Sequence, residues 1–342
     1  MAERLIKLSS GNVEVGVLAD LGGRVVLLRL AGMNNILKAD SSLWNSPPKI
    51  KKTFSPEARW RAYNGHIVWL GPQSGWWTQQ DKSPRRLRRK AQWPPDPYLC
   101  YGNYQILEIT NRYLLMLGPE SEFSGVQLLK SIYIDELDRV IFKVRAKNIR
   151  NEAVSWDLWL NTRLDGFARC YVPVNNPTKV RTLCATNSRL EQKSDFSHTQ
   201  GFYCLDPLSP KKEKKCRWTK AFIPADKGFM AAFNQSQSLI IHFKPHPESL
   251  IHPEHSLVEL YNYTTHSRSE ALNELEYHTP YVTLQPGETM ETSQIWQLSE
   301  YSQTSDSHAP YISHLNTSTQ KHQCYTSSLS LSDSPAMPSV FS

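Results

Sequence analysis

The sequence predicts an all-β protein built as one large antiparallel β-sandwich. Short apolar or alternating stretches follow one another through the 342-residue chain and are separated by turn residues such as Gly, Pro, Asn and Asp. The first half of the chain shows no three-turn stretch with the 3.6-residue apolar stripe of a helix. Strands that follow one another without intervening helices are typical of antiparallel sheets.

The N-terminal segment contains the first predicted strands. Residues 13–17 alternate Val with polar or small residues, Gly22-Gly23 turns the chain, and residues 24–30 return as a strongly apolar strand. The remaining predicted strands lie at residues 66–69, 104–110, 113–117, 127–134, 140–148, 155–161, 229–233, 239–243 and 257–263.

The composition changes after Glu300. Residues 301–342 are rich in Ser and Thr and show no periodic apolar pattern. We therefore predict a sandwich domain over residues 1–300 and a disordered tail over residues 301–342.

Charge and cysteine content argue against several classes of protein. The formal charge of +7 comes partly from the blocks Arg85–Lys90 and Lys211–Lys215, but no nucleic-acid-binding motif accompanies them. The six cysteines form no CxxC pair, so neither a disulfide framework nor a structural zinc site is indicated. The chain shows no apolar leader and no run of about 18 apolar residues. We expect a cytoplasmic protein with no nucleic-acid or membrane partner and no cofactor.

Four histidines between residues 242 and 255 are the densest group of possible metal ligands. Three prolines interrupt this segment, which excludes the helical i, i+4 spacing of many metal sites. We expect exposed loop histidines here and no metal: His242, His246, His252 and His255.

The most informative stretch is residues 273–298. Its first part places Glu274, Glu276 and His278 on one face of a predicted strand, with Leu275 and Tyr277 on the other. An acidic face with an imidazole suits the wall of a polar cleft, but it also suits a solvated sheet face. The second part predicts two strands folded about a Pro-Gly turn at residues 286–287.

These motifs, in this order, resemble a known family. The opening VEVGVLADLGGRVVLLRLAGMNNIL, the central LLKSIYIDELDRVIFKVRAKNIRNEAVSWDLWLNT, and the segments GHIVWLGPQSGWW, WPPDPY and ELEYHTPYVTLQPGE are similar to the galactose mutarotase-like superfamily. Within it they resemble the DUF4380 branch. The resemblance covers most of residues 10–298 and implies a large β-sandwich whose concave face binds a small-molecule sugar or a glycan.

The resemblance also implies a chemistry. Mutarotases (aldose 1-epimerases) interconvert sugar anomers with a base on the anomeric hydroxyl and an acid on the ring oxygen, roles that suit a carboxylate and a histidine. Glu276 matches the family's base, with Glu274 as the alternative, and the acid is His66 or His278. One departure is that Thr162 and Arg163 follow Asn161, where typical mutarotases carry a His.

Several further residues are candidates for substrate binding. Aromatic rings stack on the apolar face of a pyranose, although each of them also suits a core, and Arg163 suits either a substrate anion or a surface ion pair. The substrate-binding candidates are Trp69, Trp76, Trp77, Trp93, Asp96, Arg163 and Glu274.

The sequence leaves the catalytic status open. A mutarotase-type isomerase is the first hypothesis. The alternatives are a glycan-binding module of the same fold without catalysis, and a carbohydrate lyase or hydrolase.

Overall fold

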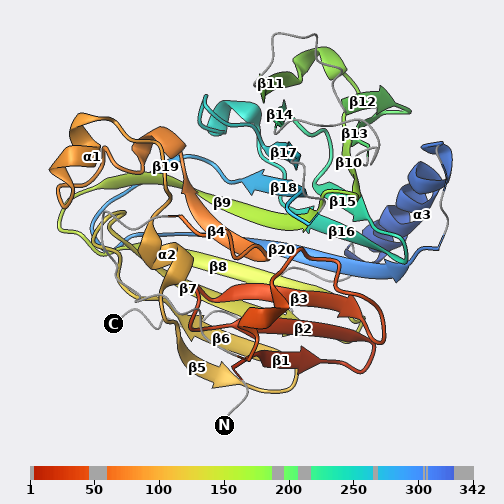
Figure 1. Ribbon diagram of the computed structural model, residues 1–342, viewed down its shortest axis with the longest axis horizontal. Coiled ribbons are helices and arrows are strands. Elements are labelled where there is room, and N and C mark those ends of the chain that lie inside the picture. The colour runs from red at the N-terminus through yellow and green to blue at the C-terminus, as the bar shows by residue number, and fades with distance from the viewer. Residues whose placement is uncertain are drawn as a thin grey trace.

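The fold is a β-sandwich of two large antiparallel sheets. The computed structural model describes residues 4–45, 60–186, 196–206, 217–264, 269–302, 305 and 307–326. Within these residues, twenty strands form two ten-stranded sheets that pack face to face (Figure 1). The prediction of an all-β antiparallel sandwich is confirmed.

The first sheet, sheet A, carries the segment with the acidic face. Its central strands are β9 (Val154–Asp165) and β18 (Leu272–His278), which pair antiparallel. In spatial order its strands are β1 (Ile6–Ser9), β2 (Val13–Leu18), β3 (Arg24–Leu30), β4 (His66–Gly71), β9, β18, β17 (Val258–Thr264), β14 (Arg217–Ile223) and β11 (Arg181–Thr186), while β19 (Val282–Leu284) pairs with β9.

The second sheet, sheet B, covers one face of sheet A. In spatial order its strands are β12 (Phe196–Thr199), β13 (Phe202–Leu205), β10 (Arg169–Pro173), β15 (Phe229–Phe233), β16 (Gln237–Phe243), β20 (Thr289–Glu300), β8 (Val140–Asn148), β7 (Val126–Ile134), β6 (Tyr113–Leu117) and β5 (Gln105–Ile109).

The core lies between the two sheets and fixes which way each strand faces. Tyr277 of β18 stacks on Phe243 of β16, with ring centroids 4.5 Å apart. Leu275, two residues earlier, is also fully buried. Side chains alternate along a strand, so Glu274 and Glu276 lie on the outer face of sheet A, away from sheet B. The predicted division of this strand into two faces is confirmed.

The predicted turn at Pro286-Gly287 joins two sheets rather than two strands of one hairpin. Gly287 has φ of +80°, a value that glycine adopts easily. The strand before the turn, β19, pairs with β9 of sheet A, whereas β20 pairs with β8 and β16 of sheet B. The two predicted strands and the turn between them are confirmed, but each strand pairs with partners distant in sequence rather than with the other.

Apart from the C-terminal helix, helices are few and short among the described residues. α1 (Pro84–Arg88) contains most of the first basic block, and α2 (Pro97–Tyr101) follows it. Single turns of 3-10 helix are η1 (Ser41–Leu43), η2 (Gln73–Gly75), η3 (Pro177–Lys179) and η4 (Glu248–Leu250). The second basic block, Lys211–Lys215, lies outside the described residues.

The C-terminal stretch contains a helix where the sequence predicted disorder. α3 (Ala309–Thr326) lies beside β15 and β16 (Figure 1). Its residues Tyr311, Ile312 and Leu315 are buried in one cluster with Phe233 and Tyr301. Their spacing places them on one side of a helix, so a few apolar residues order this stretch despite its Ser and Thr content. Residues 327–342 lie outside the described part.

The helices offer no transmembrane segment. In the part of the chain that the structure describes, none is both long and apolar enough to span a bilayer.

Candidate functional site

Polar side chains gather on the outer face of sheet A, across β9, β18 and β17. In the strand registers Asn161 pairs with Glu276, and Glu276 pairs with Glu259. In the next row Arg163 pairs with Glu274, and Glu274 with Tyr261. Directly paired residues lie on the same face of a sheet, so these strands bring three acidic residues together.

Glu276 lies at the centre of this group and is completely buried. Its Oε2 accepts a hydrogen bond from Trp159 Nε1 at 2.9 Å and contacts Lys220 Nζ at 2.9 Å. Burial, together with repulsion from Glu259 and Glu274, raises the pKa of Glu276 well above its usual value, even though Lys220 opposes the shift. This environment favours the protonated form of Glu276 more than water does.

Glu274 lies beside it and is ion-paired. Arg163 Nη2 lies 2.7 Å from Glu274 Oε1, and Asn161 Nδ2 donates to Glu274 Oε2 at 2.9 Å. Glu274 and Glu276 lie two residues apart on one face of β18. We call these two residues the carboxyl pair. The charge of Glu274 contributes to the raised pKa of Glu276, because a neighbouring negative charge disfavours the ionised form.

Lys220 of β14 connects the carboxyl pair to a third acid. Its Nζ lies 2.5 Å from Glu259 Oε2 as well as 2.9 Å from Glu276 Oε2. Burial alone would lower the pKa of Lys220, but the two carboxylates outweigh burial and raise it. Burial would likewise raise the pKa of Glu259, but Lys220 and His278 reverse the effect and hold it well below its usual value.

Two histidines complete the network. His278 lies between acids, with Nδ1 3.3 Å from Asp157 Oδ1 and Nε2 3.6 Å from Glu259 Oε2. Although burial favours the neutral ring, Asp157 and Glu259 raise the pKa of His278 to about 9. His255 stacks on His278 with ring centroids 4.0 Å apart, and burial and the charge of His278 lower its pKa.

Some of these residues are close enough to hold a cation. Ligand atoms of Asp157, His255 and His278 lie within 4.8 Å of one another, as do those of Glu259, Glu276 and His278. Lys220 and protonated His278 already supply positive charge to the buried carboxylates. The network is thus charge-balanced by the protein's own side chains. The prediction of exposed loop histidines is wrong: His255 is buried in this network, His242 is buried on β16, and His246 and His252 are half-buried.

An aromatic cluster adjoins the network. Trp69 of β4 makes edge-to-face contacts with Trp60, Trp76 and Trp159, and their ring centroids lie 5.0 to 5.7 Å from its own. Trp93 closes the cluster, 6.0 Å from Trp76, and is 46% exposed. Trp69, Trp76 and Trp93 therefore lie at the same site, where Trp93 presents the most open face.

Solvent reaches the network from the side of β14. The side chain of Lys220 is 14% exposed, while Glu274 is 7% exposed and Glu276 only 1%. Tyr261 and Trp218 are half-buried on the same face. A ligand approaching from this side meets Lys220 and Tyr261 before it meets the carboxyl pair.

His66 does not belong to the site. It lies in the core between the sheets, 4.5 Å from the ring of Phe142 and 4.7 Å from that of Trp296. Its Nδ1 contacts Thr162 Oγ1 at 2.9 Å, and burial lowers its pKa well below the usual value. The proposed acid role of His66 is wrong because β4 turns it toward sheet B, whereas Trp69 on the same strand faces the site.

Trp77 and Asp96 also have structural roles. Trp77 is buried against Phe123, and its Nε1 donates to Pro94 O at 2.6 Å. Asp96 accepts a hydrogen bond from Tyr98 N at the start of α2 and another from Ser121 Oγ. The prediction that these two residues bind substrate is not supported.

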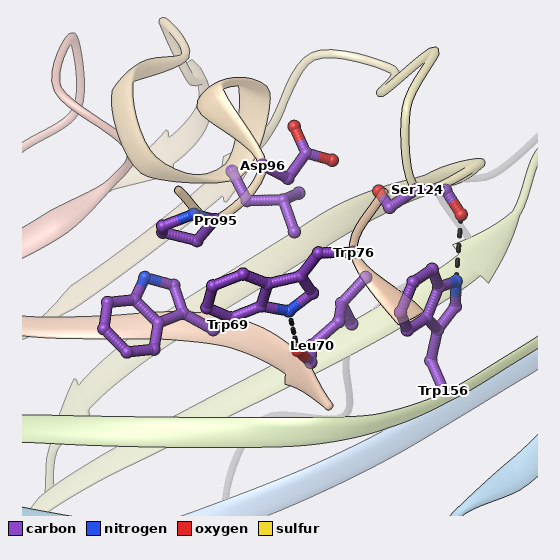
Figure 2. Close-up of a pocket in the computed structure, with 8 residues that line it drawn as sticks. Trp69, Leu70, Trp76, Pro95, Asp96, Ser124 and Trp156 are labelled. Carbon is purple, nitrogen blue, oxygen red and sulfur yellow. Dashed lines mark hydrogen bonds between the residues drawn. The ribbon is translucent and has the colours of Figure 1, made fainter. Parts of the chain in front are cut away.

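A small cavity lies under the aromatic cluster. It measures about 10 Å³ and is lined by residues that include Trp69, Trp76, Asp96 and Trp156, which leaves room for no more than a single water molecule. Figure 2 shows the indole of Trp76 donating to Leu70 O and that of Trp156 donating to Ser124 O. The cavity is an imperfection in packing and cannot hold a sugar.

The sequence missed several site residues. Trp159, Lys220 and Asp157 carry no local signal, because only the strand order places them beside Glu276. Glu259 and Tyr261 lie on one face of the predicted strand at residues 257–263, and only its pairing with β18 places that face beside Glu276.

Comparisons with known proteins agree with this architecture. A family model described as "Domain of unknown function (DUF4380)" matches residues 3–299. No curated protein matches the sequence.

Solved structures resemble the fold at low identity. The Slr1438 protein from Synechocystis sp. PCC 6803 has a TM-score of 0.54 at 11% identity, over 88% of this chain and 97% of that one. A galactose mutarotase-like protein from Lactobacillus casei has a TM-score of 0.51 at 9% identity, over 86% and 100%. A galactose mutarotase-like protein from Clostridium acetobutylicum also scores 0.51, at 11% identity, over 87% and 96%. These likenesses concern the fold alone.

Proposed function

The chain belongs to the DUF4380 family, and from its mutarotase-like fold and its carboxyl pair we propose that it binds a sugar on the outer face of sheet A and interconverts the sugar's anomers. The observation that carries the proposal is the pairing of Glu274 with Glu276. Burial and neighbouring acids raise the pKa of Glu276 well above its usual value, which suits an acid, and Glu274 is paired with Arg163. Anomer exchange needs one acid and one base at the same time.

In the proposed reaction these two residues exchange protons with the sugar and end in their starting states. Glu276 gives its proton to the ring oxygen while Glu274 removes the proton from the anomeric hydroxyl. This assignment takes the alternative base, Glu274, and makes Glu276 the acid in place of a histidine. The bond between the anomeric carbon and the ring oxygen breaks, and an aldehyde forms. After rotation of the aldehyde, the ring oxygen attacks its other face and returns a proton to Glu276, while Glu274 gives its proton to the new anomeric hydroxyl.

Other side chains would hold the substrate and the charges. Asn161 Oδ1 and Arg163 Nε are buried and have no hydrogen-bond partner among the residues that the structure describes. A sugar hydroxyl both donates and accepts, so it can satisfy an amide oxygen and a guanidinium N–H alike. Lys220 keeps Glu276 in place through its contact with Oε2 and would stabilise the anion that forms when Glu276 loses its proton.

The test is anomer exchange measured by NMR exchange spectroscopy on a panel of aldoses. Glu276→Gln keeps the shape of the side chain and removes its acid, so we expect exchange catalysed by the protein to fall by a factor of about 100 or more. Glu291→Gln is the matched control, because Glu291 lies on β20 of sheet B, where its side chain is 61% exposed. Equal exchange rates in wild type and Glu276→Gln would refute the proposal.

The burial of the carboxyl pair favours a second candidate function. Glu276 is fully covered, and a protein that only binds a glycan needs no access to it. Calorimetric binding of a sugar without catalysed exchange would select this non-catalytic binding module.

A further inference from the structure

A half-exposed aromatic surface continues the site beyond the carboxyl pair. Trp218 of β14 and Tyr261 of β17 stack with ring centroids 6.2 Å apart and an interplanar angle of 24°. Both are half-buried, and Leu183 beside them on β11 is 47% exposed. We call Trp218 and Tyr261 the aromatic shelf.

The strand register places this shelf on the same face as the carboxyl pair. Tyr261 pairs with Glu274, and Lys220 of β14 pairs with Tyr261. Trp218 and Lys220 are two residues apart on one strand, so they share the outer face. Neighbouring strands lie about 4.8 Å apart, so Trp218 stands two strands, about 10 Å, from the backbone of β18. Trp218 is therefore far enough from β18 for a second sugar ring to stack on it while the first ring lies over Tyr261 and the carboxyl pair.

The two aromatic groups of the site differ in what they can bind. Trp69, Trp76 and Trp159 are at most 5% exposed, and the faces and edges of their rings contact one another. The shelf keeps exposed ring surface and lies beside the partly exposed side chain of Lys220. A flat apolar ring next to a hydrogen-bond donor suits a pyranose, which has an apolar face and a polar edge.

We propose that the aromatic shelf is a second sugar subsite, and that the ligand is the reducing end of an oligosaccharide or glycan rather than a free monosaccharide. The identity of the reacting unit rests on the proposed function. The shelf itself rests on the placement of Trp218 and Tyr261.

Calorimetry on matched ligands tests the shelf. The probes are D-glucose with maltotriose and cellotriose, and D-galactose with β-1,4-galactotriose, each also followed by NMR exchange at the reducing end. We expect a trisaccharide to bind about tenfold more tightly than its monosaccharide, from one additional stacking contact. Trp218→Ala should abolish this gain and leave the monosaccharide Kd unchanged, whereas Trp218→Tyr should keep most of it.

Trp44→Ala is the matched control, because Trp44 is a half-buried tryptophan packed against a separate cluster around Leu21. Thermal unfolding of each variant verifies that it is folded. Equal Kd values for monosaccharides and trisaccharides, or a gain that survives in folded Trp218→Ala, would overturn the second subsite while leaving the proposed function intact. A trisaccharide gain that depends on Trp218 without catalysed exchange would support the subsite and refute the isomerase. If wild type binds none of the probes, both proposals fail.

Discussion

Lys220→Met tests the charge network most directly. Lys220 contacts Glu259 and Glu276, and both acids are completely buried. Methionine has a similar length and no charge, so the substitution removes the cation without opening a large cavity. Breaking a buried ion pair by removing one partner costs about 3 to 5 kcal/mol. Because the Lys220 side chain keeps 14% exposure, we expect about 3 kcal/mol, at the low end of that range.

The destabilisation caused by Lys220→Met should depend on pH, because Lys220 affects the ionisation of Glu259. The cations around Glu259 hold its pKa below the unfolded value, against the opposite effect of burial. A carboxyl group with a lowered folded pKa stabilises the protein above its unfolded pKa, and this contribution is lost as the pH falls through the folded value. Lys220→Met removes much of that contribution. The difference in free energy of unfolding between wild type and variant should therefore be largest near pH 8 and shrink below about pH 5.

Urea denaturation of wild type and variant across this pH range is the assay. Lys143→Met is the control, because Lys143 is a half-buried lysine on β8 of sheet B; it should change the free energy of unfolding by less than about 1 kcal/mol. A loss below about 1 kcal/mol in Lys220→Met, or a loss that does not depend on pH, would refute the reasoning.

Two further substitutions test other parts of the molecule. Lys130 is buried in the core, where burial and then Arg24 lower its pKa to about 7. In the unfolded chain Lys130 keeps its proton up to its higher, ordinary pKa. The unfolding free energy of wild type should therefore rise between pH 7 and pH 10 by up to about 4 kcal/mol. Lys130→Met should lack this rise in urea titrations; parallel curves of unfolding free energy against pH for the two proteins would contradict the prediction. Leu315 of α3 is fully buried, so Leu315→Ala should cost about 2 to 4 kcal/mol and lower Tm; an unchanged Tm would mean that α3 contributes nothing to stability.

Local patterns were enough to predict the strands but not their neighbours. The predicted strands at residues 113–117, 140–148 and 229–233 have the same bounds in the structure, because alternation and turn residues act over a few positions. The face shared by Glu274 and Glu276 was predictable for the same reason. Lys220 was not, because it is 56 residues away in sequence and reaches Glu276 only through the order of β18, β17 and β14.

The errors have a common physical origin. In β4 both faces are buried, so alternation placed His66 and Trp69 on opposite sides without indicating which side faces sheet B. In the C-terminal stretch the Ser and Thr content suggested disorder, while Tyr311, Ile312 and Leu315 were enough to dock a helix. Both cases depend on which surface a segment meets, and a single sequence does not contain that information.

The acid groups stand on β9, β17 and β18, inside a continuous ladder, whereas Trp60, Trp93 and His255 come from connecting segments at its margin. Rigid strands tolerate little rearrangement, while loops accept insertions and replacements readily. If the proposed function is correct, exchanging these connecting segments between relatives would therefore alter which sugar is bound and leave the carboxyl pair in place. On this scaffold, a change of ligand preference would need substitutions in the connecting segments rather than in the strands.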